Sequence, residues 1–315
     1  MPLYTSVPID DPKLHNQTEL TRVSEEELRY YITPYPCSLP LKILRVICFF
    51  VFLGPIKMIF TFLFLFLYYV TVSFLGTLSP LFHNKREFKT WAGKLTYFSV
   101  RACLFSLGIV HISVNGEIHP ETRTVVVNHL TMVDPISVLS QAPVSYLVMS
   151  SLKGISFFEH TSKIFDIIYV DRSKKEGITA QIQNFQNDPS YLPITIFPEG
   201  KITNGECVLG FRSGAFINDT PIQPITLRYK HYLCPRNMAS IAWCQDDALE
   251  YIFQLFTIPF MTLEVTILDK LDWKGTDVEP AERAKQAELA MANQLGCLAL
   301  ANTNKEIFMK NKKED

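Results

Sequence analysis

Two side chains suited to acid–base chemistry, His129 and Asp134, stand five residues apart, after the apolar run TVVV and Asn128. If that run is a strand, His129 leaves its end at the rim of a sheet. Asp134 precedes Pro135 and is therefore placed to be the N-cap of the next helix. The carboxylate could then bind one imidazole nitrogen and direct the other outward, as in a general base whose nucleophile is a substrate hydroxyl. Taken alone, the pair is explained as readily by a capping aspartate and a loop histidine.

Polar side chains follow two further apolar runs. Glu199 and Gly200 come directly after the run at 193–197 and Pro198, and the glycine permits a sharp turn and close approach of a substrate. An ordinary turn with a solvated glutamate is the alternative. Arg172 follows the run at 166–170, where a guanidinium could bind a phosphate through two N–H groups. A surface ion pair with Asp171 is the alternative there.

The elements that must position these residues belong to an α/β pattern that begins near residue 110. Short β-branched runs alternate with helical stretches, which predicts a mixed, largely parallel sheet flanked by helices. Because parallel strands end at the same rim of a sheet, the three polar segments should lie near one another. The expected strands are 109–114, 123–127, 144–149, 166–170, 193–197, 222–228 and 262–268, and the expected helices are 86–107, 135–141, 154–162, 174–187 and 280–299.

An apolar stretch over residues 46–78 precedes this domain, and its only charge is Lys57. As one helix it would be about 50 Å long, whereas the hydrocarbon core of a bilayer is about 30 Å thick. Gly54-Pro55 offers a natural break. The stretch is therefore predicted to be a bent hairpin in one leaflet or a single span over 58–78, and basic residues on both sides favour the hairpin. A buried pair of core helices is disfavoured by the length and phenylalanine content.

The composition excludes several classes of protein. Hydrophobic residues make up 48% of the 315 residues and charged residues 19%, which excludes an intrinsically disordered chain and disfavours a wholly soluble one. The formal net charge of −1 gives no basic field for nucleic acid. The seven cysteines show no CxxC spacing, so neither a zinc site nor a redox motif is expected. We expect the cysteines to be reduced thiols in a cytosol-facing protein.

Together these segments resemble the glycerolipid acyltransferases, the family of the lysophosphatidic acid acyltransferases. NHLTMVD is similar to the HxxxxD motif, VDR stands in the place of the arginine-bearing second motif, FPEG is similar to the third, and IQPITLRY, with Pro224, to the fourth. The resemblance covers about residues 85–300. The stretch after FPEG is similar to the lysophosphatidylcholine acyltransferase branch, through Thr203-Asn204, Arg212, Gly214-Ala215-Phe216 and Gln223-Pro224. Lys201 departs from the threonine usual after FPEG, which leaves the choice of acceptor open.

The resemblance implies the glycerolipid acyltransferase fold and transfer of an acyl group from acyl-CoA to a lysophospholipid hydroxyl, with a lysophosphatidylcholine-type acceptor favoured. No cofactor or metal is expected, because a thioester is already activated and acyl-CoA is a co-substrate. His129 would be the general base and Asp134 would orient it. Arg172 would bind the acceptor phosphate, and Glu199 and Gly200 would position the acceptor. The remaining expected substrate-binding residues are Asn128, Lys153, Lys201 and Arg212.

Two alternatives stay open at this point. The acceptor could instead be glycerol 3-phosphate or 1-acylglycerol 3-phosphate, because acceptor choice depends on the shape of the pocket. A catalytically silent scaffold on membranes or lipid droplets could keep the same fold, although the presence of both His129 and Asp134 disfavours it.

The expected layout is a flexible polar tail over 1–40 with a short helix at 24–32, a membrane anchor over 41–82, the acyltransferase domain over 83–303 and a charged tail over 304–315. Lys312 and Lys313 resemble the dilysine signal that retrieves membrane proteins to the endoplasmic reticulum, and a solvated charged end is the alternative. We therefore expect the endoplasmic reticulum membrane, with the catalytic domain and the C-terminus cytosolic and the lipid droplet as a second location. The expected partners are acyl-CoA, a lysophospholipid and the bilayer.

Overall fold

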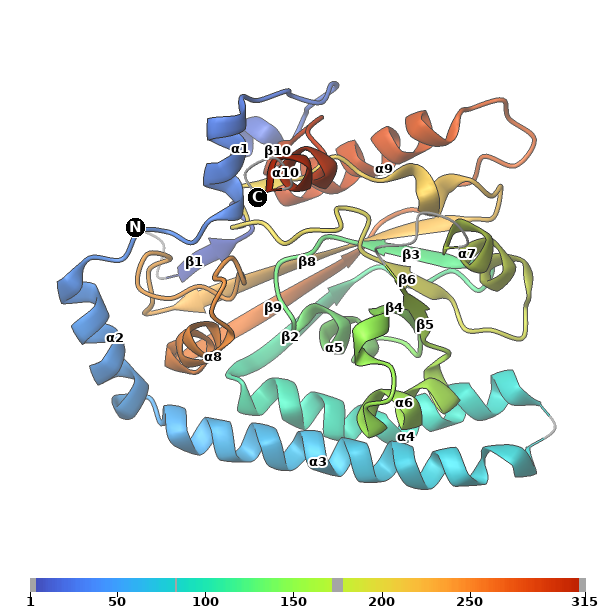
Figure 1. The fold of residues 1–315 in the computed structure, drawn as a ribbon, viewed down its shortest axis with the longest axis horizontal. Helices are drawn as coiled ribbons and strands as arrows, with labels where there is room; N and C mark the ends of the chain where they lie inside the picture. Colours follow the sequence, from blue (N-terminus) through green and yellow to red (C-terminus); the bar gives the residue numbers. More distant parts are fainter. Residues whose placement is uncertain (1–3, 83, 172–177, 312–315) are drawn as a thin grey trace.

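The computed structural model of the chain describes residues 4–82, 84–171 and 178–311 (Figure 1). The predicted phosphate ligand Arg172 and the dilysine pair Lys312 and Lys313 lie outside these residues.

Within the described residues, eight strands form one mixed sheet in the order β2–β9–β8–β3–β6–β4–β5, and β1 adds to β8 (Figure 1). The pairs β8–β9 and β1–β8 are antiparallel and the other pairs in this sheet are parallel, so the expected mixed, largely parallel sheet is confirmed. The strands are β1 (Tyr4–Val7), β2 (Ile109–Asn115), β3 (Thr124–Val127), β4 (Ser145–Met149), β5 (Ile168–Val170), β6 (Ile194–Ile196), β8 (Ile222–Tyr232) and β9 (Phe260–Ile267). Strands β7 (Cys207–Val208) and β10 (Leu298–Ala299) form a separate parallel pair.

Helices cover both faces of the sheet (Figure 1). One face carries α7 (Ile178–Asn187) and α9 (Pro280–Leu295). The other carries α3 (Gly54–Leu78), α4 (Lys85–Ser106), α5 (Asp134–Leu139), α6 (Ser156–Phe165) and α8 (Ala248–Thr257). Three more helices are α1 (Glu25–Ile32), α2 (Leu39–Val51) and α10 (Asn304–Asn311).

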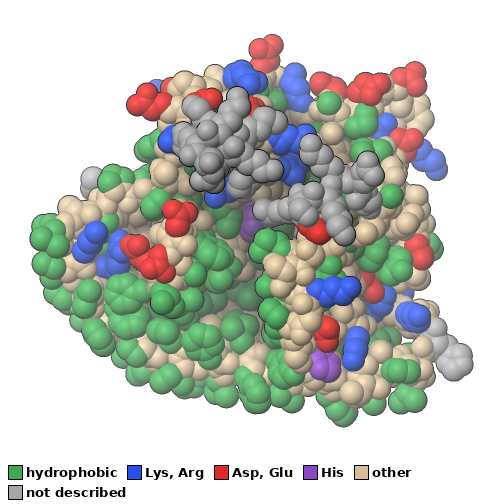
Figure 2. Space-filling view, viewed as in Figure 1, with side chains coloured by type: hydrophobic (Ala, Val, Ile, Leu, Met, Phe, Trp, Pro, Cys, Tyr) green, Lys and Arg blue, Asp and Glu red, His purple; other side chains and the backbone are tan. Residues whose placement is uncertain are grey.

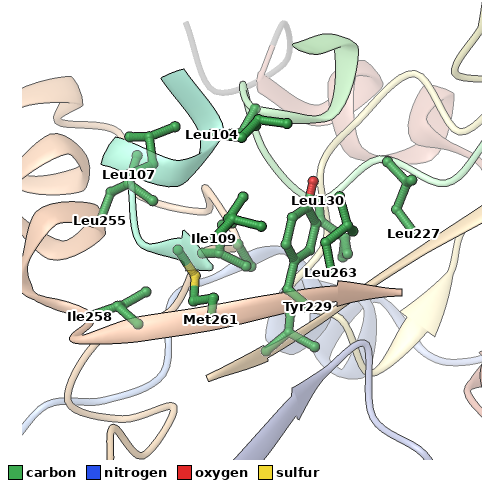
Figure 3. Packing of buried hydrophobic residues seen from close by; sticks show 14 of the residues in the cluster. Leu104, Leu107, Ile109, Leu130, Leu227, Tyr229, Leu255, Ile258, Met261 and Leu263 are labelled. Carbon is green, nitrogen blue, oxygen red and sulfur yellow. The ribbon is translucent and has the colours of Figure 1, made fainter. Parts of the chain in front are cut away.

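The core follows from the alternation of side chains along the strands. On β3, Val125 and Val127 are buried in the cluster beneath the sheet, together with Tyr229 of β8. Val126 points the other way and packs in the cluster that includes Met291 of α9. Figure 3 shows the first cluster from close by, where Tyr229 stands among leucines and isoleucines with its hydroxyl directed toward the loop of Leu130. The sheet is therefore buried on both faces, as a parallel sheet requires.

The apolar stretch breaks where its sequence predicts. Helix α2 ends at Val51, Leu53 takes a left-handed φ of 58°, and α3 begins at Gly54 with Pro55 in its first turn. A Cβ on Gly54 would lie 2.5 Å from the ring of Phe49, so only glycine fits at this bend.

Residues Gly54–Leu81 form a helix that is long and apolar enough to cross a membrane. Of its most apolar 18-residue segment, 22% is buried inside the protein. The buried side of α3, which includes Tyr68, Val72 and Leu75, packs against α4 and α6. The ammonium of Lys57 donates to the carbonyl of Ile258 at 2.6 Å and so ties the start of α3 to the end of α8. The helix is thus anchored to the globular part along its length.

The N-terminal segment differs from the expected flexible tail. Strand β1 pairs with β8, the amide of Ile9 donates to Gly205, and α1 buries Leu28 against Leu209 and Leu300. Backbone hydrogen bonds to a free strand edge hold this segment, and a polar composition does not reveal them. In the expected charged tail, residues 304–311 form α10.

Candidate active site

The site is built at the rim where β3 and β6 end side by side. These strands pair in parallel from Thr124 and Ile194 onward, so the residues after them emerge together. The imidazole of His129, after β3, stacks on the ring of Phe197, after β6, with ring centroids 4.4 Å apart. The structure thus brings together the two segments that the sequence analysis singled out separately.

His129 and Asp134 are in direct contact. The Nδ1 atom of His129 lies 2.9 Å from Oδ2 of Asp134. The same oxygen accepts the amides of Leu130 at 2.7 Å and Thr131 at 2.8 Å, while Oδ1 accepts the hydroxyl of Tyr229 at 2.9 Å. Asp134 is fully buried, so these four donors replace water around its charge.

The prediction that Asp134 is the N-cap of the following helix was wrong. Val133 is the N-cap of α5, and Asp134 is the first helical residue. Its side chain turns back into the loop instead of capping the helix, because three donors of residues 129–131 lie within its reach. The short loop between β3 and α5 is thereby closed around one carboxylate.

This geometry fixes the tautomer of His129. Since Nδ1 faces a carboxylate, it carries the proton, and Nε2 presents a lone pair. The histidine side chain is 23% exposed, whereas its aspartate partner is 0% exposed. An imidazole held in this way can accept a proton at Nε2 while the buried carboxylate stabilises the resulting charge.

Glu199 occupies a different place from the one expected. Its carboxyl is buried, with Oε1 accepting the amide of His129 at 2.8 Å and Oε2 accepting the amide of Leu209 at 2.9 Å. Burial raises the pKa of Glu199 to about 8, and the two backbone hydrogen bonds oppose that shift. Both oxygens are therefore engaged by the protein, which argues against the direct contact with a substrate that its motif suggested.

Gly200 makes the turn that its sequence position predicts. Its φ is +63°, a left-handed value that favours glycine. A Cβ at this position would lie 2.4 Å from Nδ2 of Asn304, so the turn is also closely packed. Oδ1 of Asn304 in turn accepts Nε and Nη2 of Arg212, at 2.8 and 2.6 Å.

The other expected substrate-binding residues differ in their surroundings. Asn128 is buried and exchanges two hydrogen bonds with the backbone of Leu227, which locks β3 to β8. Lys201 is partly exposed and lies near the half-buried thiol of Cys244. Desolvation raises the pKa of Cys244 to about 12, and the charge of Lys201 opposes that shift. Lys153 is exposed after β4. Thus Asn128 has a structural task, whereas both lysines remain accessible.

Sequence reasoning missed two residues of the site, Tyr229 and Asn304. Tyr229 shares its face of β8 with Leu227 and Ile225, so the alternation of side chains could have placed it beneath the loop after β3. Asn304 contacts Arg212 from 92 positions along the chain, and no local pattern announces it.

A family model described as Acyltransferase matches residues 111–228, which contain His129, Asp134 and Glu199. Residues 111–228 lie in an acyltransferase domain. The expected resemblance to the glycerolipid acyltransferases is thereby confirmed, and the chain carries the domain of an enzyme.

Curated relatives of this acyltransferase domain are lysophospholipid acyltransferases. The chain is 26% identical over 226 residues to lysophospholipid acyltransferase LPEAT2 of Arabidopsis thaliana, covering 69% of this chain and 41% of that protein. It is 27% identical over 198 residues to human lysophosphatidylcholine acyltransferase 2, covering 56% and 35%. The chain therefore spans about two fifths of the length of the curated relatives it matches.

A solved structure shares the fold. The 1-acyl-sn-glycerophosphate acyltransferase PlsC from Thermotoga maritima superposes with a TM-score of 0.55 at 16% sequence identity, covering 76% of this chain and 95% of that one. The expected fold class is confirmed by this match and by the sheet described above.

Proposed function

We propose that this protein transfers a fatty acyl group from acyl-CoA to the free hydroxyl of a lysophospholipid, with a lysophosphatidylcholine-type acceptor. The observation that carries the proposal is the pair of His129 and Asp134, buried on the carboxylate side and exposed on the imidazole side, within an acyltransferase domain. The names of the curated relatives support the choice of acceptor class.

In the proposed reaction His129 acts as a general base. Its Nε2 accepts the proton of the acceptor hydroxyl as the oxygen attacks the thioester carbonyl. Asp134 stabilises the imidazolium through the contact at Nδ1. The tetrahedral intermediate then collapses, the carbon–sulfur bond breaks, and the proton passes from His129 to the departing CoA sulfur. The products are the diacyl phospholipid and free CoA, and the step consumes no cofactor.

Cationic side chains around the rim would hold the anionic groups of the two substrates. Arg212 stands beside the Gly200 turn, and Lys201 follows it directly, so both suit the phosphate of the acceptor. Arg172, which follows β5 in the sequence, is assigned the same task. Lys153, exposed after β4, suits a phosphate of CoA. Glu199 and Gly200 would shape the acceptor pocket indirectly, the first by holding the backbone of His129.

Docking on a bilayer would supply both substrates, since each carries a long acyl chain. Figure 2 shows apolar side chains gathered over the lower left of the molecule, where α2 and α3 lie. Exposed residues of α2 and α3 include Phe50, Phe62 and Phe66, and α4 exposes Phe98 and Phe105. We assign this face to the hydrocarbon of one leaflet, in keeping with a monotopic hairpin anchor. We further propose the endoplasmic reticulum, with the domain facing the cytosol, as its location.

The experiment that tests this proposal measures acyl transfer in membranes that carry the full chain. Oleoyl-CoA is supplied with lysophosphatidylcholine, lysophosphatidylethanolamine, lysophosphatidylserine, lysophosphatidic acid or glycerol 3-phosphate, and both CoA release and lipid product are followed. We expect transfer to lysophosphatidylcholine that His129→Ala abolishes and Asn293→Ala retains, because Asn293 bonds to the N-terminal segment at Gln17. Preference for glycerol 3-phosphate would contradict the proposed lysophosphatidylcholine-type acceptor. Equal rates for the parent chain and His129→Ala on every acceptor would favour a catalytically silent scaffold.

A further inference from the structure

An open groove of about 400 Å³ lies on the surface of α4, and none of its lining residues belongs to the site of His129. The residues that line it are Asn84, Arg86, Glu87, Thr90, Trp91 and Lys94. They stand at the start of α4, which packs beside α3 and runs in the opposite direction (Figure 1). The proposed acyl transfer therefore leaves this groove without a task.

The lining side chains fall into two rows along the helix. Residues four positions apart are neighbours on the surface of a helix. Arg86, Thr90 and Lys94 therefore form one row, and Glu87 and Trp91 form the row beside it. At about 1.5 Å per residue, each of the two cations is about 6 Å from Thr90 along the helix axis. The first row thus carries two positive charges, and the second carries a carboxylate and an aromatic ring.

The charged groups of both rows are available to a ligand. Glu87, Trp91 and Lys94 are all exposed. Among the residues that the structure describes, no ion pair includes Glu87, Lys94 or Arg86. One N–H of Arg86 donates to the carbonyl of Pro189 at 3.0 Å, which anchors the guanidinium without cancelling its charge. The groove therefore presents opposite charges that do not neutralise one another.

This pattern of charge matches a ligand that carries both a phosphate and an ammonium. Arg86 and Lys94 suit a phosphate, because guanidinium and ammonium groups form charge-assisted hydrogen bonds to its oxygens. A quaternary ammonium is attracted by an indole ring such as that of Trp91 and by the carboxylate of Glu87. A headgroup with a phosphate and no cation would place its negative charge beside Glu87. The charges therefore favour a zwitterionic headgroup over an anionic one.

The surface next to the groove is apolar and suits the acyl chains of a lipid. Leu95, Phe98 and Phe105 follow Trp91 at steps of four, three and seven residues, so they continue the same face of α4. All three are exposed. Tryptophan is enriched where a protein passes from the hydrocarbon to the headgroups of a bilayer. A lipid whose headgroup occupies the groove can therefore lay its chains along this side of α4.

We propose that this groove binds the zwitterionic headgroup of a bilayer phospholipid, phosphatidylcholine, and holds the start of α4 at the level of the headgroups. The phosphate lies between Arg86 and Lys94, and the choline lies against Trp91 and Glu87. The lipid held here is a bound component of the membrane and not the reacting acceptor. The inference rests on the bilayer docking proposed above and is independent of the acyl transfer.

The test uses the headgroup without its acyl chains, so that insertion into a bilayer plays no part. Glycerophosphocholine is titrated into the full chain in maltoside detergent, and saturation transfer to its choline methyl groups gives the dissociation constant. Trp91→Leu and Lys94→Glu should each weaken binding about threefold to tenfold. Lys274→Glu makes the same charge change in the exposed loop before α9 and should leave binding unchanged. Any binding at the site of His129 is common to all four proteins and does not affect their comparison.

A second probe tests the role of the ammonium. Glycerophosphoglycerol has the same phosphate and no cation, and it should bind the parent chain less tightly than glycerophosphocholine. Glu87→Lys should reverse this preference, because it replaces the carboxylate that faces the choline with a cation.

Two results would overturn the inference. One is binding of glycerophosphocholine that Trp91→Leu and Lys94→Glu leave unchanged. The other is tighter binding of glycerophosphoglycerol by the parent chain, which would show a site for an anionic lipid. Failure of the parent chain to float with phosphatidylcholine vesicles would instead overturn the bilayer docking, while the titrations still decide whether the groove binds the headgroup.

Discussion

The carboxyl of Glu199 holds the backbone of His129, with 2.8 Å between its Oε1 and the histidine amide. The acid of the FPEG segment is thus buried beneath the base of the other motif and also holds Leu209 at the root of the segment that carries Arg212. One side chain therefore links the loop of His129 to the segment that carries Arg212. The two motifs, which are far apart in the sequence, are therefore in direct contact in the structure.

Glu199→Gln tests whether Glu199 positions His129 or binds substrate. Glutamine offers one acceptor where the two backbone amides need two, so a buried amide loses its partner at a cost of about 1–3 kcal/mol in the free energy of unfolding. We expect kcat to fall with the KM for lysophosphatidylcholine nearly unchanged, as measured by steady-state kinetics. A rise in KM at constant kcat would show that Glu199 contacts the acceptor.

Tyr229→Phe removes one of the four donors to Asp134 and keeps the packing of the ring. The lost hydrogen bond to a buried carboxylate predicts a decrease of about 1.5–3 kcal/mol in the free energy of unfolding. We also expect a smaller kcat, because Asp134 is less firmly held beneath His129. Thermal unfolding and initial rates check the two effects, and a variant as stable and as fast as the parent would show that the hydroxyl is dispensable.

Glu288→Gln should change how stability depends on pH. Burial raises the pKa of Glu288 to about 9, well above its ordinary value of 4.5, so the folded state retains a proton that the unfolded state loses. Its contribution to stability is therefore complete below about pH 4.5 and declines as pH rises toward 9. Glutamine keeps the acceptor for Phe211 without titrating, so it should remove up to about 1.4 kcal/mol of this decline per pH unit. Parallel stability curves for the two proteins from pH 5 to 8.5 would contradict this account.

The apolar face is tested with charges. Phe62→Glu and Phe66→Glu place carboxylates on the exposed side of α3, where transfer into hydrocarbon costs about 2–3 kcal/mol each. The double variant should lose most of its flotation with phosphatidylcholine vesicles. Ile217→Glu, an exposed apolar position next to the short turn that packs against α9, is the matched control and should float like the parent. Equal flotation of the double variant would move the bilayer contact elsewhere.

The sequence predicted the central strands because short β-branched runs such as TVVV are typical of buried strands. It also predicted the bend at Gly54-Pro55. Strand β1 was missed because YTSV is short and half polar, and its stability comes from pairing with β8. Helix α8 was not among the expected helices, although the sequence carries a signal for it. Asp247 caps the helix and is followed by apolar residues at helical spacing.

At the site, the pairing of His129 with Asp134 follows from local spacing, because both residues belong to one loop. The places of Glu199 and Arg212 depend on contacts that no local rule contains. The local sequence predicts Glu199 to be a solvated turn residue. In the structure it accepts the amide of His129, which lies 70 positions away in the chain. Burial and long-range hydrogen bonding, which decide the task of each residue, are properties of the folded chain.

The central claim is that His129 is the base of an acyl transfer. The most direct measurement is the rate of oleoyl transfer from oleoyl-CoA to lysophosphatidylcholine by the purified chain and by His129→Gln, with thermal unfolding of both followed in parallel. We predict a loss of at least about 10²-fold in kcat for the variant. Its unfolding should stay cooperative at a somewhat lower temperature, because Asp134 loses one of its four donors. Transfer by His129→Gln at the rate of the parent chain would contradict the account.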